Sequence, residues 1–202
     1  MTIRVLLADD QALVRGALAA LLDLEPDLEV VVQVGTGTEV VDAAREHEVD
    51  VCLLDIEMPG IDGIEAAAQL AREVPECRSL VVTTFGRPGY LARALDAGAS
   101  GFVVKDTPAH ELADAVRRVH EGLRVVDPTL AATTLLDGPN PLTAREAEVL
   151  REALTGAPVA TIASNVHLSQ GTVRNHLSAA IGKTGTATRA EAARVARERG
   201  WI

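Results

Sequence analysis

Aromatic residues and cysteines are scarce in this sequence, and each scarcity excludes a class of protein. Aromatics make up only 2% of the 202 residues, so Leu, Val, Ile and Ala must form any core. Hydrophobic residues reach 48%, which is enough for a sizeable core without disulfides. The two cysteines, Cys52 and Cys77, form neither a CxxC pair nor a metal-ligand spacing. We therefore expect a reduced protein without a disulfide framework.

Long apolar runs are also missing. None approaches the roughly 20 residues that a helix needs to span a bilayer, so we expect no membrane insertion. The first ten residues, MTIRVLLADD, place acidic residues directly after an apolar stretch, unlike a secretory signal peptide. These features favour a cytoplasmic protein. The sequence also contains no GxGxxG, Walker or GxSxG motif, which excludes the common nucleotide-binding and serine-hydrolase signatures.

Positive charge is scarce in the first two thirds of the chain. The net charge is −10, which by itself argues against nucleic-acid binding. The charge is unevenly distributed, however: 24 acidic and 11 basic residues lie up to Asp137, whereas 5 acidic and 8 basic residues follow it. An acidic part followed by a mildly basic part indicates two domains with different partners.

The first 121 residues alternate apolar runs with amphipathic segments. Near-continuous runs of Val, Leu and Ile are typical of parallel strands that are covered on both faces. Five such runs alternating with five helical segments predict an α/β domain with a doubly wound, five-stranded parallel sheet. The expected strands are Ile3–Ala8, Glu29–Val34, Val49–Leu54, Ser79–Thr83 and Gly101–Val104. The expected helices are Ala12–Leu22, Glu39–Glu46, Gly63–Glu73, Pro88–Ala97 and Pro108–Glu121.

Residues 122–141 break this alternation, and we expect them to link two domains. A short helix can run over Pro128–Leu136, and the following Asp137–Pro141 is rich in Pro and Gly. Over 142–202 the pattern is purely helical, which predicts a second, all-α domain. Its expected helices are Thr143–Leu154, Val159–Val166, Gln170–Lys183 and Arg189–Arg199.

Polar residues follow the expected strands at the sheet edge where ligands of such folds bind. Asp9 and Asp10 come directly after the first strand, and Asp55 comes directly after the third. Thr83 ends the fourth strand and Lys105 follows the fifth. Clustered carboxylates repel one another, and a hard divalent cation such as Mg²⁺ lets them coexist. The set suits phosphoryl transfer to Asp55, with Lys105 pairing with the phosphoryl group and Thr83 donating a hydrogen bond to it.

Each of these residues, taken alone, has an ordinary explanation. An acidic pair after a strand is usually a solvated loop or a helix cap, and a single Thr or Lys at a strand end carries little information. Their joint position on one edge of one sheet is what favours a functional site.

The first 121 residues resemble the receiver domain of bacterial response regulators throughout, in the segments LLADD, LLDIEMPGIDG, VVTTF and AGASGFVVKD. The resemblance implies a flavodoxin-like fold in which a sensor histidine kinase transfers phosphate to Asp55. It also implies that Asp10, Asp55 and the main-chain carbonyl of Glu57 ligate Mg²⁺, while Asp9 acts through water. The residues that would contact the phosphoryl group or switch on phosphorylation are Thr83, Lys105 and Phe102.

The segment from residue 158 predicts two helices with a break before Ser169, which can cap the second helix. Val173, Leu177 and Ile181 have the spacing of a core face. The outward residues are of the types that contact phosphates and base edges. For an arbitrary pair of helices, a bundle with a merely solvated polar face would be the better interpretation. The outward residues are Thr172, Arg174, Asn175 and Ser178.

Residues 141–202 resemble the helix-turn-helix domain of the LuxR/NarL/FixJ class, and PLTAREAEVL, LSQGTVRNHL and TRAEAARVA carry the resemblance. It implies that Arg174, Asn175 and Ser178 face the major groove of double-stranded DNA, whereas Thr172 and Lys183 contact phosphates. The basic cluster that is common late in the second helix is reduced to Lys183 in this chain, so a single domain should bind DNA weakly.

The first helix of the α/β domain is apolar nearly all round apart from Arg15, which indicates either a deeply buried helix or a second covered face. Together with the last helix of that domain it can form a self-complementary patch, and the family often dimerises there. We therefore expect a homodimer on phosphorylation, which reads an inverted repeat. The interface residues we assign are Leu13, Ala17, Ala113 and Val116.

Two other functions remain open. The chain can be an atypical regulator that binds DNA without phosphorylation, although no residue of the acidic pocket is missing. An Asp-nucleophile phosphatase usually has a second Asp two residues after the nucleophile, and here that residue is Glu57. We therefore expect a regulator rather than an enzyme. Within the family, the stretch TTFGRPGYLARAL is most similar to the DesR-type subgroup.

Overall fold

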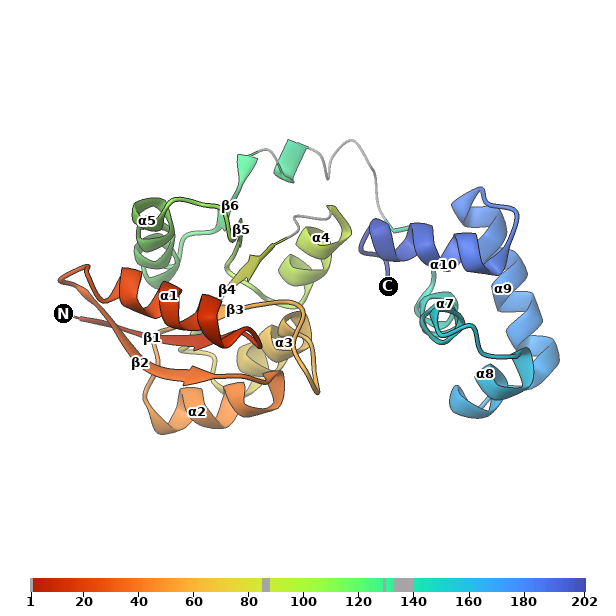
Figure 1. Cartoon of the computed structure of the whole chain (residues 1–202), viewed down its shortest axis with the longest axis horizontal. Coiled ribbons are helices and arrows are strands. Elements are labelled where there is room, and N and C mark those ends of the chain that lie inside the picture. Colours follow the sequence, from red (N-terminus) through yellow and green to blue (C-terminus); the bar gives the residue numbers. More distant parts are fainter. Residues whose placement is uncertain (1, 85–87, 129, 133–139) are drawn as a thin grey trace. The chain divides into compact units, whose positions relative to one another are not determined.

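The computed structural model of the chain describes residues 2–84, 88–128, 130–132 and 140–202. They form two compact units, an α/β unit and a helical unit (Figure 1). Within these described ranges, no helix is both long and apolar enough to cross a membrane.

The α/β unit is built on a parallel sheet with the strand order β2-β1-β3-β4-β5-β6 (Figure 1). The doubly wound parallel sheet predicted from the sequence is confirmed, and a short sixth strand extends it at the β5 edge. The strands are β1 (Ile3–Ala8), β2 (Leu28–Val34), β3 (Val51–Leu54), β4 (Arg78–Thr83), β5 (Gly101–Val104) and β6 (Val125–Val126).

The sixth strand lies in the segment that we expected to be a linker. It pairs in parallel with β5, and the amide of Asp127 donates to the carbonyl of Phe102 at 3.3 Å. A segment of two residues is too short to show the alternating pattern that predicts a strand. It is a strand here because it pairs with the free edge of β5. Helical residues follow at 130–132. Pro128 is helical as well. Residues 129 and 133–136 of the expected short helix, and residues 137–139 of the expected run Asp137–Pro141, lie outside the described residues.

Helices cover both faces of the sheet, which explains why the strands are apolar on both sides. Val5 and Leu7 of β1 pack in one core cluster with residues of the first and last helices of the unit. Leu6 lies between them, points to the opposite face and is fully buried as well. The helices of this unit are α1 (Ala12–Leu22), the 3₁₀ helix η1 (Gly37–Glu39), α2 (Val40–Glu46), α3 (Gly63–Glu73), α4 (Pro88–Asp96) and α5 (Ala109–His120).

The start of α3 is fixed against the end of β3. The side chain of Asp62 caps the helix by accepting a hydrogen bond from the amide of Glu65 at 2.7 Å. A Cβ atom at Gly63 would lie only 2.0 Å from the carbonyl oxygen of Asp55. Glycine therefore allows α3 to begin directly beside the strand end that carries Asp55.

The helical unit packs its helices around a core of Leu, Ile, Val and Ala. Trp201, the single tryptophan of the chain, is buried in this core. Thr143 and Glu146 form a capping box at the first helix of the unit. The helices are α7 (Ala144–Leu154), α8 (Val159–Asn165), α9 (Gln170–Thr184) and α10 (Arg189–Glu198). These bounds agree with the sequence-based expectation to within one residue at each end.

Candidate functional site

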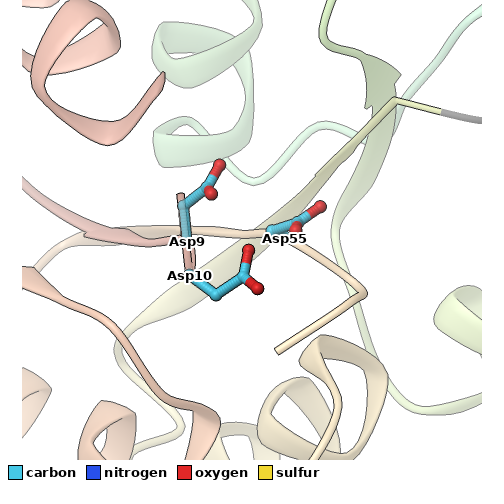
Figure 2. A group of neighbouring side chains, drawn as sticks. All are labelled: Asp9, Asp10 and Asp55. Carbon is cyan, nitrogen blue, oxygen red and sulfur yellow. The ribbon is translucent and has the colours of Figure 1, made fainter. Parts of the chain in front are cut away.

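Three carboxylates meet at the carboxyl ends of β1 and β3 (Figure 2). The two strands are paired in register up to Ala8 and Leu54, so the next residues of each strand lie side by side. The amide of Asp55 donates to the carbonyl of Ala8 at 2.8 Å, which fixes this junction. One carboxylate oxygen from each of Asp9, Asp10 and Asp55 lies within 4.8 Å of the others. The side chains that the sequence places at one sheet edge therefore form one acidic pocket.

Lys105 joins this pocket from the end of β5. Its Nζ lies 2.6 Å from Oδ2 of Asp9 and 3.2 Å from Oδ1 of Asp55. The amide of Lys105 donates to the carbonyl of Thr83 at 2.8 Å, and Thr83 itself is buried at the end of β4. The Asp9 and Asp55 side chains are each only 4% exposed, so the two salt bridges are shielded from water. Lys105 thus lies where it can pair with a group attached to Asp55.

The charge and the donor atoms of the pocket fit a hard divalent cation. Burial raises the pKa of Asp55 to about 6, an effect that Lys105 opposes and the charge of Asp9 reinforces. One ammonium does not balance three carboxylates, so the pocket keeps an excess of negative charge that a divalent cation offsets. Carboxylate oxygens are also the ligands that Mg²⁺ prefers. Asp10 is exposed, so the pocket is open to solvent on that side.

The remaining residues expected around the pocket lie in different environments. Glu57 is exposed in the loop between β3 and α3, two residues beyond Asp55. Phe102, the expected switch aromatic, is fully buried on β5. It is three residues before Lys105, so the two belong to the same strand and its end.

A second candidate surface lies on α9. Ser169 caps this helix, as expected, by accepting a hydrogen bond from the amide of Thr172 at 3.1 Å. Val173 and Leu177 are buried and Ile181 is partly buried, which confirms the core face of the helix. Thr172 is half-buried, and its hydroxyl lies 2.8 Å from the Ser169 hydroxyl. The exposed face of α9 carries Arg174, Asn175 and Ser178.

The structure gives Lys183 a partner that the sequence does not reveal. Its Nζ donates to both carboxylate oxygens of Glu146, at 2.7 and 3.0 Å. Glu146 is buried and also accepts from the amide of Thr143 at 2.7 Å. The ammonium group of Lys183 therefore joins the end of α9 to the start of α7, and its expected contact with DNA phosphates stays a prediction. Glu146 thus takes part both in the capping box of α7 and in this salt bridge.

We expect Lys183→Met to lower the free energy of unfolding of the helical unit by about 1–2 kcal/mol, because it leaves a buried carboxylate without its charged donor. Burial alone would raise the pKa of Glu146, but hydrogen bonds from Lys183 and Thr143 hold it below its ordinary value. The stabilisation is therefore present at neutral pH and is lost as the pH falls through this lowered pKa. Urea unfolding followed by Trp201 fluorescence measures this unit selectively.

Arg194→Ala is the matched control for this test, because Arg194 pairs with Glu198 on an exposed helix face and should contribute little to stability. If Lys183→Met kept the stability of the wild type but bound DNA more weakly and with less dependence on salt, Lys183 would act mainly through a phosphate contact and not through its salt bridge.

Of the four expected interface residues, two lie on the surface and two do not. Leu13 is 87% exposed and Ala17 is also exposed, both on α1. Ala113 and Val116 are fully buried in the core beneath α5, so they cannot lie on a surface that another molecule covers. The outward residues of α5 are instead charged, whereas further exposed apolar residues follow along α1. The exposed leucines at the end of α1 and just beyond it are Leu21 and Leu24.

Arg15 of α1 was noted in the sequence only as an exception in an apolar helix. In the structure its Nη1 donates to the main-chain carbonyl of Asp9. Its side chain lines a cavity of about 10 Å³ together with Asp9 and Asp55. A single cation within an apolar helix that directly follows two acidic residues was the available signal for this contact.

Comparison with known proteins identifies both units. Residues 5–117 match the family of response regulator receiver domains, and residues 140–196 match the bacterial regulatory proteins of the luxR family. Two Bacillus subtilis proteins align over 200 residues and 99% of this chain. The "Uncharacterized transcriptional regulatory protein YvfU" is 44% identical with 100% of its length covered, and the "Transcriptional regulatory protein DesR" is 43% identical with 99% covered.

Solved structures agree with this match. The response regulator ChrA, from a heme-sensing two-component system, superposes with a TM-score of 0.59 at 33% identity. The alignment covers 100% of this chain and 99% of ChrA. A LuxR-family response regulator from Aurantimonas superposes with a TM-score of 0.64 at 29% identity, over 68% of this chain and 98% of its own.

Proposed function

This chain belongs to the response regulators that join a receiver domain to a LuxR-type DNA-binding domain, and on that premise we propose that phosphorylation of Asp55 controls its binding to DNA. Its similarity to the DesR and YvfU proteins agrees with the subgroup predicted from the sequence. The observation that carries the proposal is the buried Asp55 carboxylate, which Lys105 contacts at 3.2 Å in a pocket with two further acidic residues.

In the proposed reaction, a carboxylate oxygen of Asp55 attacks the phosphorus atom of a phosphohistidine on a sensor histidine kinase. The new oxygen–phosphorus bond forms as the nitrogen–phosphorus bond breaks, and the histidine nitrogen leaves with the bonding electrons. Lys105 would then pair with the phosphoryl oxygens, and the hydroxyl of Thr83 would donate a hydrogen bond to one of them.

A Mg²⁺ ion would be held by Asp10, Asp55 and the main-chain carbonyl of Glu57, with Asp9 contributing through a water molecule. When bound, the ion would offset the negative charge that gathers on the carboxylates and the phosphoryl group. Lys105 already forms salt bridges with Asp9 and Asp55, so its ammonium group lies beside the reacting carboxylate of Asp55 before any ligand arrives.

DNA binding is proposed to require two copies of the chain. A single α9 offers few cations to phosphates, and the acidic receiver repels DNA, so one copy should bind weakly. Dimerisation on phosphorylation would hold two α9 helices together and raise their effective concentration on one DNA site. The site would then be an inverted repeat with half-sites one helical turn apart. We place this reaction and the DNA contact in the cytoplasm.

Genomic footprinting of the chain in its phosphorylated and unphosphorylated states tests this function. We expect protected inverted repeats that appear at far lower protein concentration after phosphorylation. Equal protection by both states would instead identify a regulator that does not depend on phosphorylation.

We expect Arg174→Ala to cost about 1–3 kcal/mol of DNA-binding free energy and to relax base preference at one operator position. Arg174 is exposed in the first turns of α9, where recognition helices meet base edges, and its guanidinium is held by Gln170 at 3.3 Å. Fluorescence anisotropy with the footprinted operator and its single-base variants measures the effect.

The matched control for Arg174→Ala is Arg151→Ala, which removes the same charge from an exposed position on α7. An Arg174→Ala protein that lost affinity equally for every sequence would show that Arg174 contacts only the backbone.

A further inference from the structure

Arg15 lies on the wall of the acidic pocket, although it belongs to a helix and not to a strand end. Its neighbours along α1 are Leu, Val, Gly and Ala, so helix formation does not require a cation at this position. Its Nη1 donates to the carbonyl of Asp9, and its Nε is buried without a hydrogen-bond partner among the described residues. Arg15 as a whole is half-buried, but a buried donor nitrogen needs a hydrogen-bond partner, which in proteins is another protein group or an ordered water.

The cavity beside Arg15 offers that donor a partner. It measures about 10 Å³, close to the space that one water molecule needs. Leu18, Leu53 and Val82 close it on the apolar side, and the polar residues on its wall are Arg15, Asp9 and Asp55. A water molecule in this position can accept from Nε and donate to a carboxylate, which satisfies the guanidinium and links it to the pocket.

The contact with Asp9 acts on both carboxylates that follow β1. Asp9 and Asp10 are consecutive residues between the end of β1 and the start of α1. A carboxylate oxygen of each lies within 4.8 Å of one from Asp55 (Figure 2). The amide of Gln11 donates to Oδ1 of Asp9 at 2.8 Å, which tightens this turn. Arg15 adds an anchor from the first turns of α1, so the turn is held at the carbonyl as well as at the carboxylate.

We propose that Arg15 is a positioning residue of the acidic pocket. Its guanidinium fixes the Asp9–Asp10 turn through the Asp9 carbonyl and, with one water in the cavity, orients the carboxylates that bind the divalent cation. The inference rests on the proposed function, because it presupposes a cation at these carboxylates.

The variants Arg15→Lys and Arg15→Met distinguish the effect of the guanidinium geometry on the carboxylates from the effect of its positive charge. A lysine keeps the positive charge but has a single donor atom in place of the planar fork, so it cannot reach the Asp9 carbonyl and the cavity with the same geometry. A methionine removes the charge and keeps much of the side-chain volume. Leu22→Ala is the control for general loss of stability, because Leu22 is buried at the far end of α1 and does not border the cavity.

Mn²⁺ binding to the full-length chain, followed by electron paramagnetic resonance, tests the proposal without relying on phosphorylation. We expect the dissociation constant for Mn²⁺ to rise by about 10-fold or more in Arg15→Met and in Arg15→Lys, as is typical when a residue that orients metal ligands is lost. Leu22→Ala should bind Mn²⁺ like the wild type. Circular dichroism verifies folding, and Arg15→Lys carries the test if Arg15→Met does not fold.

Four results would overturn the inference. Wild-type affinity in both Arg15 variants would show that Arg15 does not position the ligands. Full affinity in Arg15→Lys alone would assign the effect to charge. An equal loss in Leu22→Ala would assign it to the stability of α1. A wild-type protein that bound no Mn²⁺ would instead refute the proposed function itself, and the Arg15 inference with it.

Discussion

Replacement of Asp55 by asparagine is expected to abolish phosphate incorporation from a small-molecule phosphodonor such as acetyl phosphate. An amide lacks the nucleophilic carboxylate oxygen that would form the bond to phosphorus. The reaction of the wild type should also require Mg²⁺, because the pocket holds an excess of carboxylates over cations.

Intact-mass spectrometry of wild type and Asp55→Asn, with Mg²⁺ and with a chelator, measures this effect directly. Asp106→Asn is the matched control, because it removes an exposed carboxylate next to Lys105 and should leave phosphorylation unchanged. Equal incorporation of phosphate by Asp55→Asn and wild type would show that another residue is the acceptor.

Replacement of Leu13 by aspartate is expected to prevent dimerisation of the activated protein. Leu13 is 87% exposed and Leu24 is 78% exposed, so α1 and the turn after it present large apolar side chains to solvent. The outward residues of α5 are charged, so we now assign the apolar part of the proposed interface to α1 alone. An unpaired charge buried in that interface would cost several kcal/mol, on the order of a 100-fold or greater rise in the dissociation constant.

Light scattering of the fluoroberyllate-activated chain over a range of concentrations gives that constant. Leu154→Asp makes the same chemical change at an exposed leucine of α7, in the helical unit, and should leave dimerisation intact. A Leu13→Asp protein with native circular dichroism and wild-type self-association would exclude α1 as the interface.

The two units of the chain differ in what their sequences reveal about function. In the receiver, the candidate site residues directly follow strands, and each strand end coincides with the end of an apolar run, so the sequence alone could predict that Asp9, Asp55 and Lys105 lie together. In the DNA-binding unit, the outward face of α9 follows from helical periodicity, which separated Arg174 and Asn175 from the core. The salt bridge of Lys183 does not follow from the sequence, because its partner, Glu146, is 37 residues away on another helix.

The same limit applies to α5. Helical periodicity identifies an apolar stripe, but it does not say whether that stripe packs on the chain's own sheet or on a second molecule. The structure shows that Ala113 and Val116 pack on the chain's own sheet. For α1 the sequence left open whether the helix is deeply buried, and the exposure of Leu13 shows that it is not.

The sequence by itself determined the alternation of strands and helices, the acidic sheet edge and the polar face of α9, because each depends on short-range periodicity or on the end of an apolar run. Only the tertiary structure decided the pairing of β6 with β5 and the salt bridge of Lys183 with Glu146. The physical reason is that these interactions join groups far apart in the sequence, which packing brings together and which no local pattern identifies.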